Sequence, residues 1–298
     1  MRCFVMINGG TGKSIMATAM MPLLKKKYDE VYVCSPYYDI FKCCPYVDEA
    51  FQPGMPNLYR DLLCDDDVEL LCREPYNNPR FIKKEIQLFE AWAEEWGIEL
   101  ERDPMEMLPI LTKWDELQEV HRRYDDMRKG WGKFVLVQFC GGQSPLVPQQ
   151  QAGQYNDHVE GLRRNYYKGQ ELVDLIKQEY PEHQIIHYAL PNEPSYTKTI
   201  KVELPYLAYA KACEEADAII TIDSSLQHLA ASTRTPRIVI WGETAPEHFG
   251  YASSVNLRCK GIKNTQPYFQ PLGASPALVP FPEPEEVITA LKEILPKE

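Results

Sequence analysis

The sequence predicts an α/β protein made of two Rossmann-like parallel-sheet domains that face a cleft. The chain opens on a short apolar strand, a glycine turn and a helix, and the same order returns near residue 134. Its 298 residues are enough for about two domains with a core each. Strands that alternate with helices form parallel sheets, and such sheets bind ligands beyond the carboxyl ends of their strands.

The composition excludes several classes of protein. Hydrophobic residues make up 44% of the chain and charged residues 25%, as in ordinary folded domains. The apolar runs are shorter than the roughly 20 residues that a membrane-spanning helix needs. Because the formal net charge is -11, the whole surface is not expected to bind nucleic-acid phosphates, although a local basic cleft stays open.

The nine cysteines are odd in number and none lies in a C-x-x-C pair, so zinc-ligand spacing is absent. We expect reduced cysteines that serve as small core residues. The first apolar run is too short for a secretory signal and has no cleavage site after it. These observations predict a cytoplasmic protein.

In the first part of the chain, the apolar run 2–7 predicts a buried strand that ends at a glycine turn. A helix is predicted over 13–27. Its last three residues are lysines, which suit the negative end of the helix dipole. The second strand is 31–34, which completes a βαβ unit. Further along, 79–96 presents a broad aromatic face and predicts a helix, and 113–127 predicts another.

Gly130-Trp131-Gly132 precedes the strand-like run 134–140, and we place the domain boundary near residue 130. The expected parts are 1–130, 131–282 and a terminal helical segment, 283–298. After a long loop at 145–160, the second part alternates between helix and strand. Its expected helices are 169–179, 205–215, 225–233 and 285–295, and its expected strands are 184–190, 218–222 and 237–241.

The first chemical motif is Gly9-Gly10-Thr11-Gly12-Lys13-Ser14. It ends like a phosphate-binding P-loop, but that pattern needs a glycine where Ile7 stands, inside the strand. What remains is a glycine turn at a helix N-terminus, where free amides attract anions. The alternative is a tight turn that only packs strand against helix.

Two more clusters follow apolar strands in the second half. Strand 218–222 delivers Asp223 at its carboxyl end, and Ser224 and Ser225 can cap the next helix. In that helix, Gln227 and His228 lie in the first turn, so the His228 ring can reach the same edge. The alternative is a capping role for Asp223 and the serines and a core role for His228. Strand 237–241 ends in a third cluster, Gly242, Glu243 and Thr244.

In order and spacing, these clusters resemble the heptosyltransferase-like glycosyltransferases of the ADP-heptose:lipopolysaccharide type, which have the GT-B fold. One signature of this family is Gly-x-x-Gly-Asp between a strand and a helix, to which Gly9 to Lys13 is similar. The second is an Ala-Asp strand, Asp-Ser-Gly-x-x-His-Leu-Ala-Ala, Thr-Pro and a strand ending in Phe-Gly-x-Thr. The similar segments here are 216–217, 223–231, 235–236 and 241–244. Residues 50–130 are unmatched.

The sequence departs from the family at two positions. Lys13 stands where the family has an aspartate that is thought to act as general base. A lysine takes over that role only with a strongly lowered pKa, so Lys13 instead suits a phosphate or an acidic acceptor. The glycine of Asp-Ser-Gly is Ser225 here. Either the base lies elsewhere, or the acceptor differs from the usual sugar.

The resemblance implies a metal-independent glycosyltransferase without a cofactor, which moves a sugar from a nucleotide-sugar to a glycan or lipid-linked, lipopolysaccharide-type acceptor. It places the acceptor on 1–130 and the donor on 131–282. Lys13, Asp223 and His228 are the expected catalytic residues. Expected binding residues are Gly9, Gly10, Gly12, Gly141, Gly142, Gln143, Arg163, Arg164, Ser224, Ser225, Gln227, Gly242, Glu243 and Thr244.

Three alternatives remain at this point. Arg163 and Arg164 can equally form a solvated approach to a helix instead of contacting the donor. The acceptor can be a modified base in DNA, an activity that the GT-B fold also hosts. Because the family's aspartate is missing, the chain can also be a nucleotide-sugar-binding protein without transferase activity.

Overall fold

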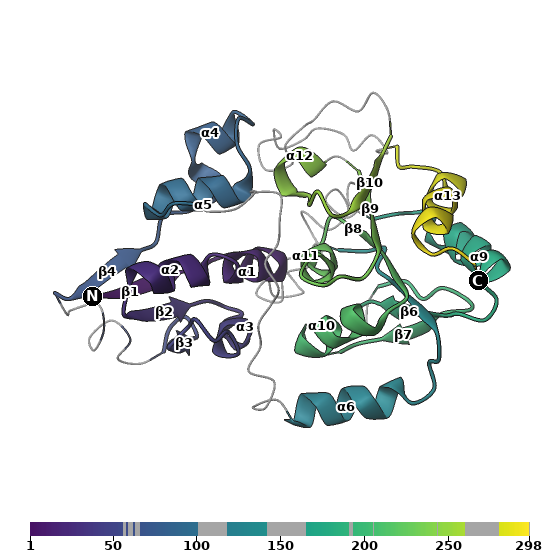
Figure 1. Ribbon diagram of the computed structural model, residues 1–298, viewed down its shortest axis with the longest axis horizontal. Helices are drawn as coiled ribbons and strands as arrows, with labels where there is room; N and C mark the ends of the chain where they lie inside the picture. Colours follow the sequence, from purple (N-terminus) through teal and green to yellow (C-terminus); the bar gives the residue numbers. More distant parts are fainter. Residues whose placement is uncertain are drawn as a thin grey trace. The chain divides into compact units, whose positions relative to one another are not determined.

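The computed structural model describes two compact units, 1–118 and 119–298, each with its own parallel sheet (Figure 1). Within them it describes residues 1–55, 58, 62, 66–100, 118–141, 165–190, 193–204, 206–242, 244–259 and 280–297. All the strand pairs are parallel and helices flank both sheets, which confirms the predicted α/β class.

The sheet of the first unit has the strand order β3-β2-β1-β4. Its strands are β1 (Arg2–Met6), β2 (Glu30–Cys34), β3 (Glu49–Phe51) and β4 (Val68–Leu71). Its helices are α1 (Thr11–Thr18), α2 (Met21–Lys27), α3 (Tyr38–Lys42), the short 3-10 helix η2 (Pro75–Asn77), α4 (Pro79–Ile82) and α5 (Leu88–Trp96). The first strand, its glycine turn and the second strand lie where the sequence predicts them. Strands β3 and β4 carry no clear pattern and were not predicted.

Two helices that the sequence predicts as continuous are each divided in the structure. The predicted helix 13–27 becomes α1 and α2, because Pro22 in the first turn of α2 has no N–H with which to continue the earlier helix. The predicted helix 79–96 becomes α4 and α5. Lys84, with φ of 64°, ends the first piece, and a capping box at Gln87 begins the second.

The sheet of the second unit has the order β10-β9-β8-β5-β6-β7. Its strands are β5 (Phe134–Val137), β6 (Gln184–Tyr188), β7 (Ile200–Val202), β8 (Ala218–Ile222), β9 (Arg237–Trp241) and β10 (Val255–Arg258). Its helices are α6 (Gln118–Arg128), α9 (Gly169–Glu179), α10 (Tyr206–Glu215), α11 (Ser225–Ala231), α12 (Pro246–Phe249) and α13 (Pro284–Ile294). The bounds of α9, β8 and β9 are those that the sequence predicts.

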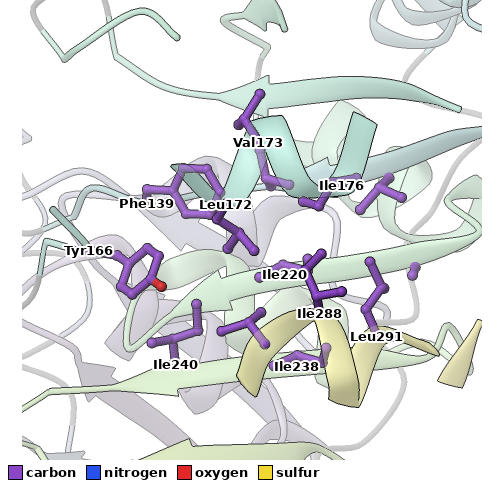
Figure 2. Close-up of a cluster of buried hydrophobic side chains, with 14 of the residues drawn as sticks. Phe139, Tyr166, Leu172, Val173, Ile176, Ile220, Ile238, Ile240, Ile288 and Leu291 are labelled. Atoms are coloured by element: carbon purple, nitrogen blue, oxygen red, sulfur yellow. The ribbon is translucent and has the colours of Figure 1, made fainter. Parts of the chain in front are cut away.

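The core of the second unit lies between its sheet and the helices α9 and α13. Figure 2 shows Leu172 and Ile176 of α9 and Leu291 of α13 directed toward strand residues such as Ile220, and all of them are buried. The strands have apolar side chains on both faces, as expected of a parallel sheet that is covered on both sides. Each fully buried side chain of this size contributes about 1.5–3 kcal/mol to folding.

The helix α6 belongs to the second unit by its contacts. Tyr124 and Arg128 both donate hydrogen bonds to Glu215 of α10, over 2.9 and 2.8 Å, and Tyr124 packs edge-on against Trp131. The division therefore lies after Gln118, whereas the sequence places it near 130, at the glycines that lead into β5. The last helix, α13, packs on α9 and β9 of the same unit.

The composition-based expectations also have structural counterparts. The described cysteines form no disulfide with one another, and most are buried as small core residues: Cys3, Cys34, Cys43, Cys44, Cys140 and Cys213. Cys72 is exposed and Cys259 half-buried. Within the described part of the chain, no helix is both long and apolar enough to cross a membrane.

Each sheet has one point where its strand order reverses. In the first unit the chain adds β2 and β3 on one side of β1 and then places β4 on the other side. In the second unit it adds β6 and β7 beside β5 and then returns to place β8 on the opposite side. Ligands of open α/β sheets bind beyond the carboxyl ends of the strands at such switch points. The pairs β1/β4 and β5/β8 therefore mark where to look for sites.

Candidate functional site

At the switch point of the second unit, the segments after β5 and β8 are joined by side-chain hydrogen bonds. Ser224 Oγ donates to Gln138 Oε1, and Thr221 Oγ1 lies 3.3 Å from Ser224 Oγ. A Cβ on Gly141 would lie only 3.2 Å from Ser224 Cβ, so the missing side chain lets the two segments approach. This edge of the sheet is thus fixed by contacts between residues far apart in sequence.

Asp223 is held by the helix that follows it. Gln227 Nε2 donates to Asp223 Oδ1 over 2.6 Å, while Gln227 Oε1 is buried without a hydrogen-bond partner among the described residues. Ser224 occupies the N-cap position of α11, but its side chain makes no capping bond because it turns to Gln138. The capping role that the sequence suggests for this serine is therefore absent. Ser225 instead forms a hydrogen bond with Tyr188.

His228 lies on the same short helix, and its ring is buried. Its Nδ1 is 2.7 Å from the Tyr251 hydroxyl, and the two rings meet edge-on. Burial lowers the pKa of His228 to about 3, so the imidazole is neutral at physiological pH. A neutral ring can donate one hydrogen bond and accept another, but it carries no charge for a phosphate.

Tyr251 is positioned by the end of the neighbouring strand. Asn256 Nδ2 donates to the Tyr251 carbonyl over 3.1 Å, and Asn256 Oδ1 accepts from Trp241 Nε1 over 2.8 Å. The predicted residues Gly242 and Thr244 follow β9 and are both buried. The carboxyl end of β9 thereby supports His228 through Tyr251, a link that the sequence does not show.

In the first unit, the glycine turn leads into α1. Gly9 has φ of 112°, a conformation that favours glycine, and a Cβ there would lie 3.1 Å from Lys13 Cδ. Gly10 occupies the N-cap position, and Gly12 lies in the first turn of the helix. The turn thus makes room for the Lys13 side chain to fold back over it. This agrees both with an anion-binding turn and with a tight turn that only packs strand against helix.

Lys13 is a buried charge with one close acidic partner. Its Nζ forms an ion pair with Glu74 Oε2 and lies 5.1 Å from the centre of the Tyr76 ring. Burial lowers the pKa of Lys13, and the hydrogen bond to Glu74 opposes that shift. Glu74 follows β4, so this pair joins the carboxyl ends of β1 and β4 at the switch point of the first sheet.

The structure thus gathers the predicted residues into two groups. Gly141, Asp223, Ser224, Ser225, Gln227 and His228 surround the switch point of the second unit, with Gly242 and Thr244 at the next strand. Gly9, Gly10, Gly12 and Lys13 lie in the first unit. The predicted residues Gly142, Gln143, Arg163, Arg164 and Glu243 lie outside the described residues.

Four residues of these groups were missed by the sequence: Glu74, Gln138, Tyr188 and Tyr251. Tyr188 is the last residue of β6 and Tyr251 follows α12, whereas Glu74 and Gln138 follow strands, so only a weak signal, a polar residue just after a strand, could have found Glu74 and Gln138. Among the described residues, no three His, Cys, Asp or Glu side chains are grouped as in a metal site.

Comparison with known families matches residues 201–271 to the sequence model of glycosyltransferase family 9 (heptosyltransferase). That segment contains β8, α11 and β9, and with them Asp223 and His228. A search of curated protein sequences finds no match.

Several solved structures share the fold along nearly the whole chain. The glycosyl transferase family 9 protein from Veillonella parvula DSM 2008 is 12% identical, with a TM-score of 0.64, and the match covers 99% of this chain and 97% of that one. E. coli ADP-heptose lps heptosyltransferase II is 14% identical, with a TM-score of 0.59 and coverage of 99% and 98%. E. coli heptosyltransferase WaaC with ADP is 10% identical, with a TM-score of 0.56 and coverage of 99% and 100%.

These findings confirm the resemblance to heptosyltransferase-like glycosyltransferases and the two-sheet GT-B class of fold. The resemblance rests on two signatures, and the family match covers the second of them, which includes the segment from Asp223 to Ala231. The matched segment also supports the enzyme class, because its sequence model is that of a glycosyltransferase family.

Proposed function

We propose that the chain is a glycosyltransferase that moves a sugar, of heptose type, from an ADP-sugar donor to a glycan or lipopolysaccharide-type acceptor. The observation that carries this proposal is the position of the family match. Residues 201–271 include the strand, turn and helix at the switch point of the second sheet, where the hydrogen-bonded side chains also lie. Among the similar structures, E. coli WaaC has been solved with ADP-2-deoxy-2-fluoro heptose, which motivates the choice of ADP.

The donor would bind beyond β5, β8 and β9. In the tautomer that accepts from Tyr251 at Nδ1, neutral His228 carries its proton on Nε2, from which it can donate to an oxygen of the diphosphate. Asp223, held by Gln227, would orient a hydroxyl of the donor, since a carboxylate next to a diphosphate is repulsive. We propose that Arg163 and Arg164 compensate the charge of the leaving group and that no metal is needed.

Two alternatives differ in what they predict. A DNA acceptor has no support from the comparisons, and the net charge of -11 opposes it. A nucleotide-sugar-binding protein without activity would bind the same donor and release no product. Turnover therefore separates this alternative from the proposal.

The first experiment is a thermal-shift screen of the protein with ADP-, UDP-, GDP- and CDP-sugars. A ligand present at 100 times its Kd stabilises the folded state by about 2.7 kcal/mol, which raises the Tm measurably. We expect ADP-heptose to give the largest shift. ADP release from ADP-heptose is then followed with and without deacylated lipopolysaccharide as acceptor. A donor-dependent shift without any ADP release would contradict the enzyme and favour the binder.

A site variant tests where the donor binds. Gly141→Ala places a Cβ 3.2 Å from Ser224 and should weaken ADP-heptose binding at least several-fold by shifting that serine. Gly130→Ala is the matched control, since a Cβ there meets nothing within 4 Å. Equal affinities for the two variants would place the donor away from the β5/β8 switch point.

A further inference from the structure

We propose that Glu74 is the general base of the transfer reaction and that Lys13 holds it in place. This inference rests on the proposed function, because it assigns a residue to the acceptor half of that reaction. The resemblance puts a carboxylate at position 13, where this chain has a lysine. The structure pairs that lysine with a carboxylate from a different element.

The pair lies where the fold favours a ligand. Lys13 is in the first turn of α1, which follows β1, and Glu74 comes three residues after the end of β4. These two strands are hydrogen-bonded neighbours in parallel, and they flank the point where the order of the sheet reverses. A substrate beyond the carboxyl ends of β1 and β4 would therefore meet this pair.

The two partners differ in how much solvent they meet. The Lys13 side chain is 8% exposed, whereas the Glu74 side chain is 31% exposed. The carboxylate is thus the partner that an acceptor can reach, and the ammonium lies behind it. Tyr76 adds its ring face to the cation and its backbone N–H to Glu74 Oε1, over 3.4 Å. The ring favours the charged form of Lys13, and the N–H bond helps to fix the direction of Glu74.

The step balances with Glu74 as the proton acceptor. An acceptor hydroxyl oxygen forms a bond to the anomeric carbon of the donor, and the bond from that carbon to the diphosphate oxygen breaks. The nucleoside diphosphate leaves with the electron pair, and the hydroxyl proton moves to Glu74. A positioned carboxylate base of this kind contributes about 10²–10⁴-fold to a rate.

The test compares ADP release from ADP-heptose, with deacylated lipopolysaccharide as acceptor, across a set of variants. Glu74→Gln should lower kcat by about 100-fold or more and leave the KM for ADP-heptose unchanged. Because this change leaves a buried lysine unpaired, the double variant Lys13→Met/Glu74→Gln removes both charges together. It should recover the Tm of the wild type and stay as inactive as Glu74→Gln.

Lys13→Met keeps the carboxylate and removes only its support. It should lower kcat less than tenfold, without a change in the KM for the donor, as expected of a positioning residue. Lys13→Asp/Glu74→Gln moves the carboxylate to position 13 and should regain part of the lost rate. Glu69→Gln is the matched control, since Glu69 is an exposed carboxylate on β4 that bonds Tyr28, and the rate should not change.

Two results would overturn the assignment. One is full activity of Glu74→Gln, or of the double variant if the single one does not fold. The other is a loss in Lys13→Met as large as that in Glu74→Gln, which would make Lys13 itself the binding group. Failure of the proposed function is distinct, because then the wild-type protein neither binds ADP-heptose nor releases ADP.

Discussion

At the scale of single residues, burial decides which protonation states the second unit can use. His228 and His187 are both buried, and burial lowers their pKa values to about 3 and about 4. His187 packs between Phe139 and Tyr196 and has no hydrogen-bond partner for either nitrogen within the described structure. Both rings are therefore neutral in the folded protein, whereas in the unfolded chain they titrate near 6.5.

This difference predicts a loss of stability in mild acid. Below pH 6.5 each of these two histidines binds a proton in the unfolded chain but stays neutral in the folded protein. The unfolding free energy therefore falls as the pH drops toward 3–4. Each histidine contributes about 1.4 kcal/mol per pH unit, or about 2 kcal/mol between pH 6.5 and 5. Urea denaturation at pH 7 and pH 5 measures this loss.

Replacing one histidine tests whether its burial causes this loss of stability in acid. His228→Gln should remove about half of the two-histidine difference between pH 7 and pH 5. His183→Gln is the comparison, because burial lowers the pKa of His183 but Asp217, 3.7 Å from that ring, opposes the shift, so that its contribution should be smaller. If His183→Gln flattens the pH dependence as much as His228→Gln does, burial of His228 is not the cause.

At the scale of elements, α13 illustrates how a predicted amphipathic helix gains its role from packing. Its buried face includes Val287, Ile288 and Leu291, which belong to the same cluster as residues of α9 and of the strands β8 and β9. Figure 2 labels Ile288 and Leu291 in this cluster. A capping box at Glu283 begins the helix. The helix thus forms part of the core of the second unit.

Leu291→Ala should lower the unfolding free energy by about 2–5 kcal/mol, because it leaves a cavity in a fully buried cluster. Glu293→Ala, on the exposed face of the same helix, should change it by less than about 0.5 kcal/mol. Urea denaturation followed by circular dichroism gives both values. A loss below about 1 kcal/mol for Leu291→Ala would show that α13 does not close this core.

At the scale of the whole molecule, the net charge is negative, whereas one of the candidate sites contains a positively charged side chain. The chain has a formal net charge of -11, yet Lys13 is buried next to Glu74 at a sheet switch point. Many other described cations are held in ion pairs on the surface, such as Lys25 with Asp48 and Lys211 with Asp125. Exposed pairs of this kind contribute little to stability.

The net charge predicts that the protein does not bind duplex DNA at physiological salt. Binding to phosphates is driven by the release of counterions, which needs a cationic surface. Fluorescence anisotropy with a short labelled duplex should therefore show no saturable binding. Saturable binding that weakens steeply as salt is raised would contradict this prediction and reopen the DNA acceptor.

The sequence by itself determined the elements whose physics is local. Apolar runs that end in glycine or aspartate defined β1, β8 and β9, and helical spacing defined α9 and α13. The order of these elements then determined the α/β class. Local rules also explain the two divided helices, since Pro22 and the backbone of Lys84 interrupt a continuous hydrophobic pattern.

Only the tertiary structure decided which side chains meet. The Lys13–Glu74 pair spans 61 residues, and the bond from Ser224 to Gln138 spans 86. Sheet order creates both contacts, because it places strands far apart in sequence next to each other at a switch point. Spacing along the chain carries no trace of that order. The sequence could therefore identify Lys13 and Asp223 as candidates, but not the partners that set their chemistry.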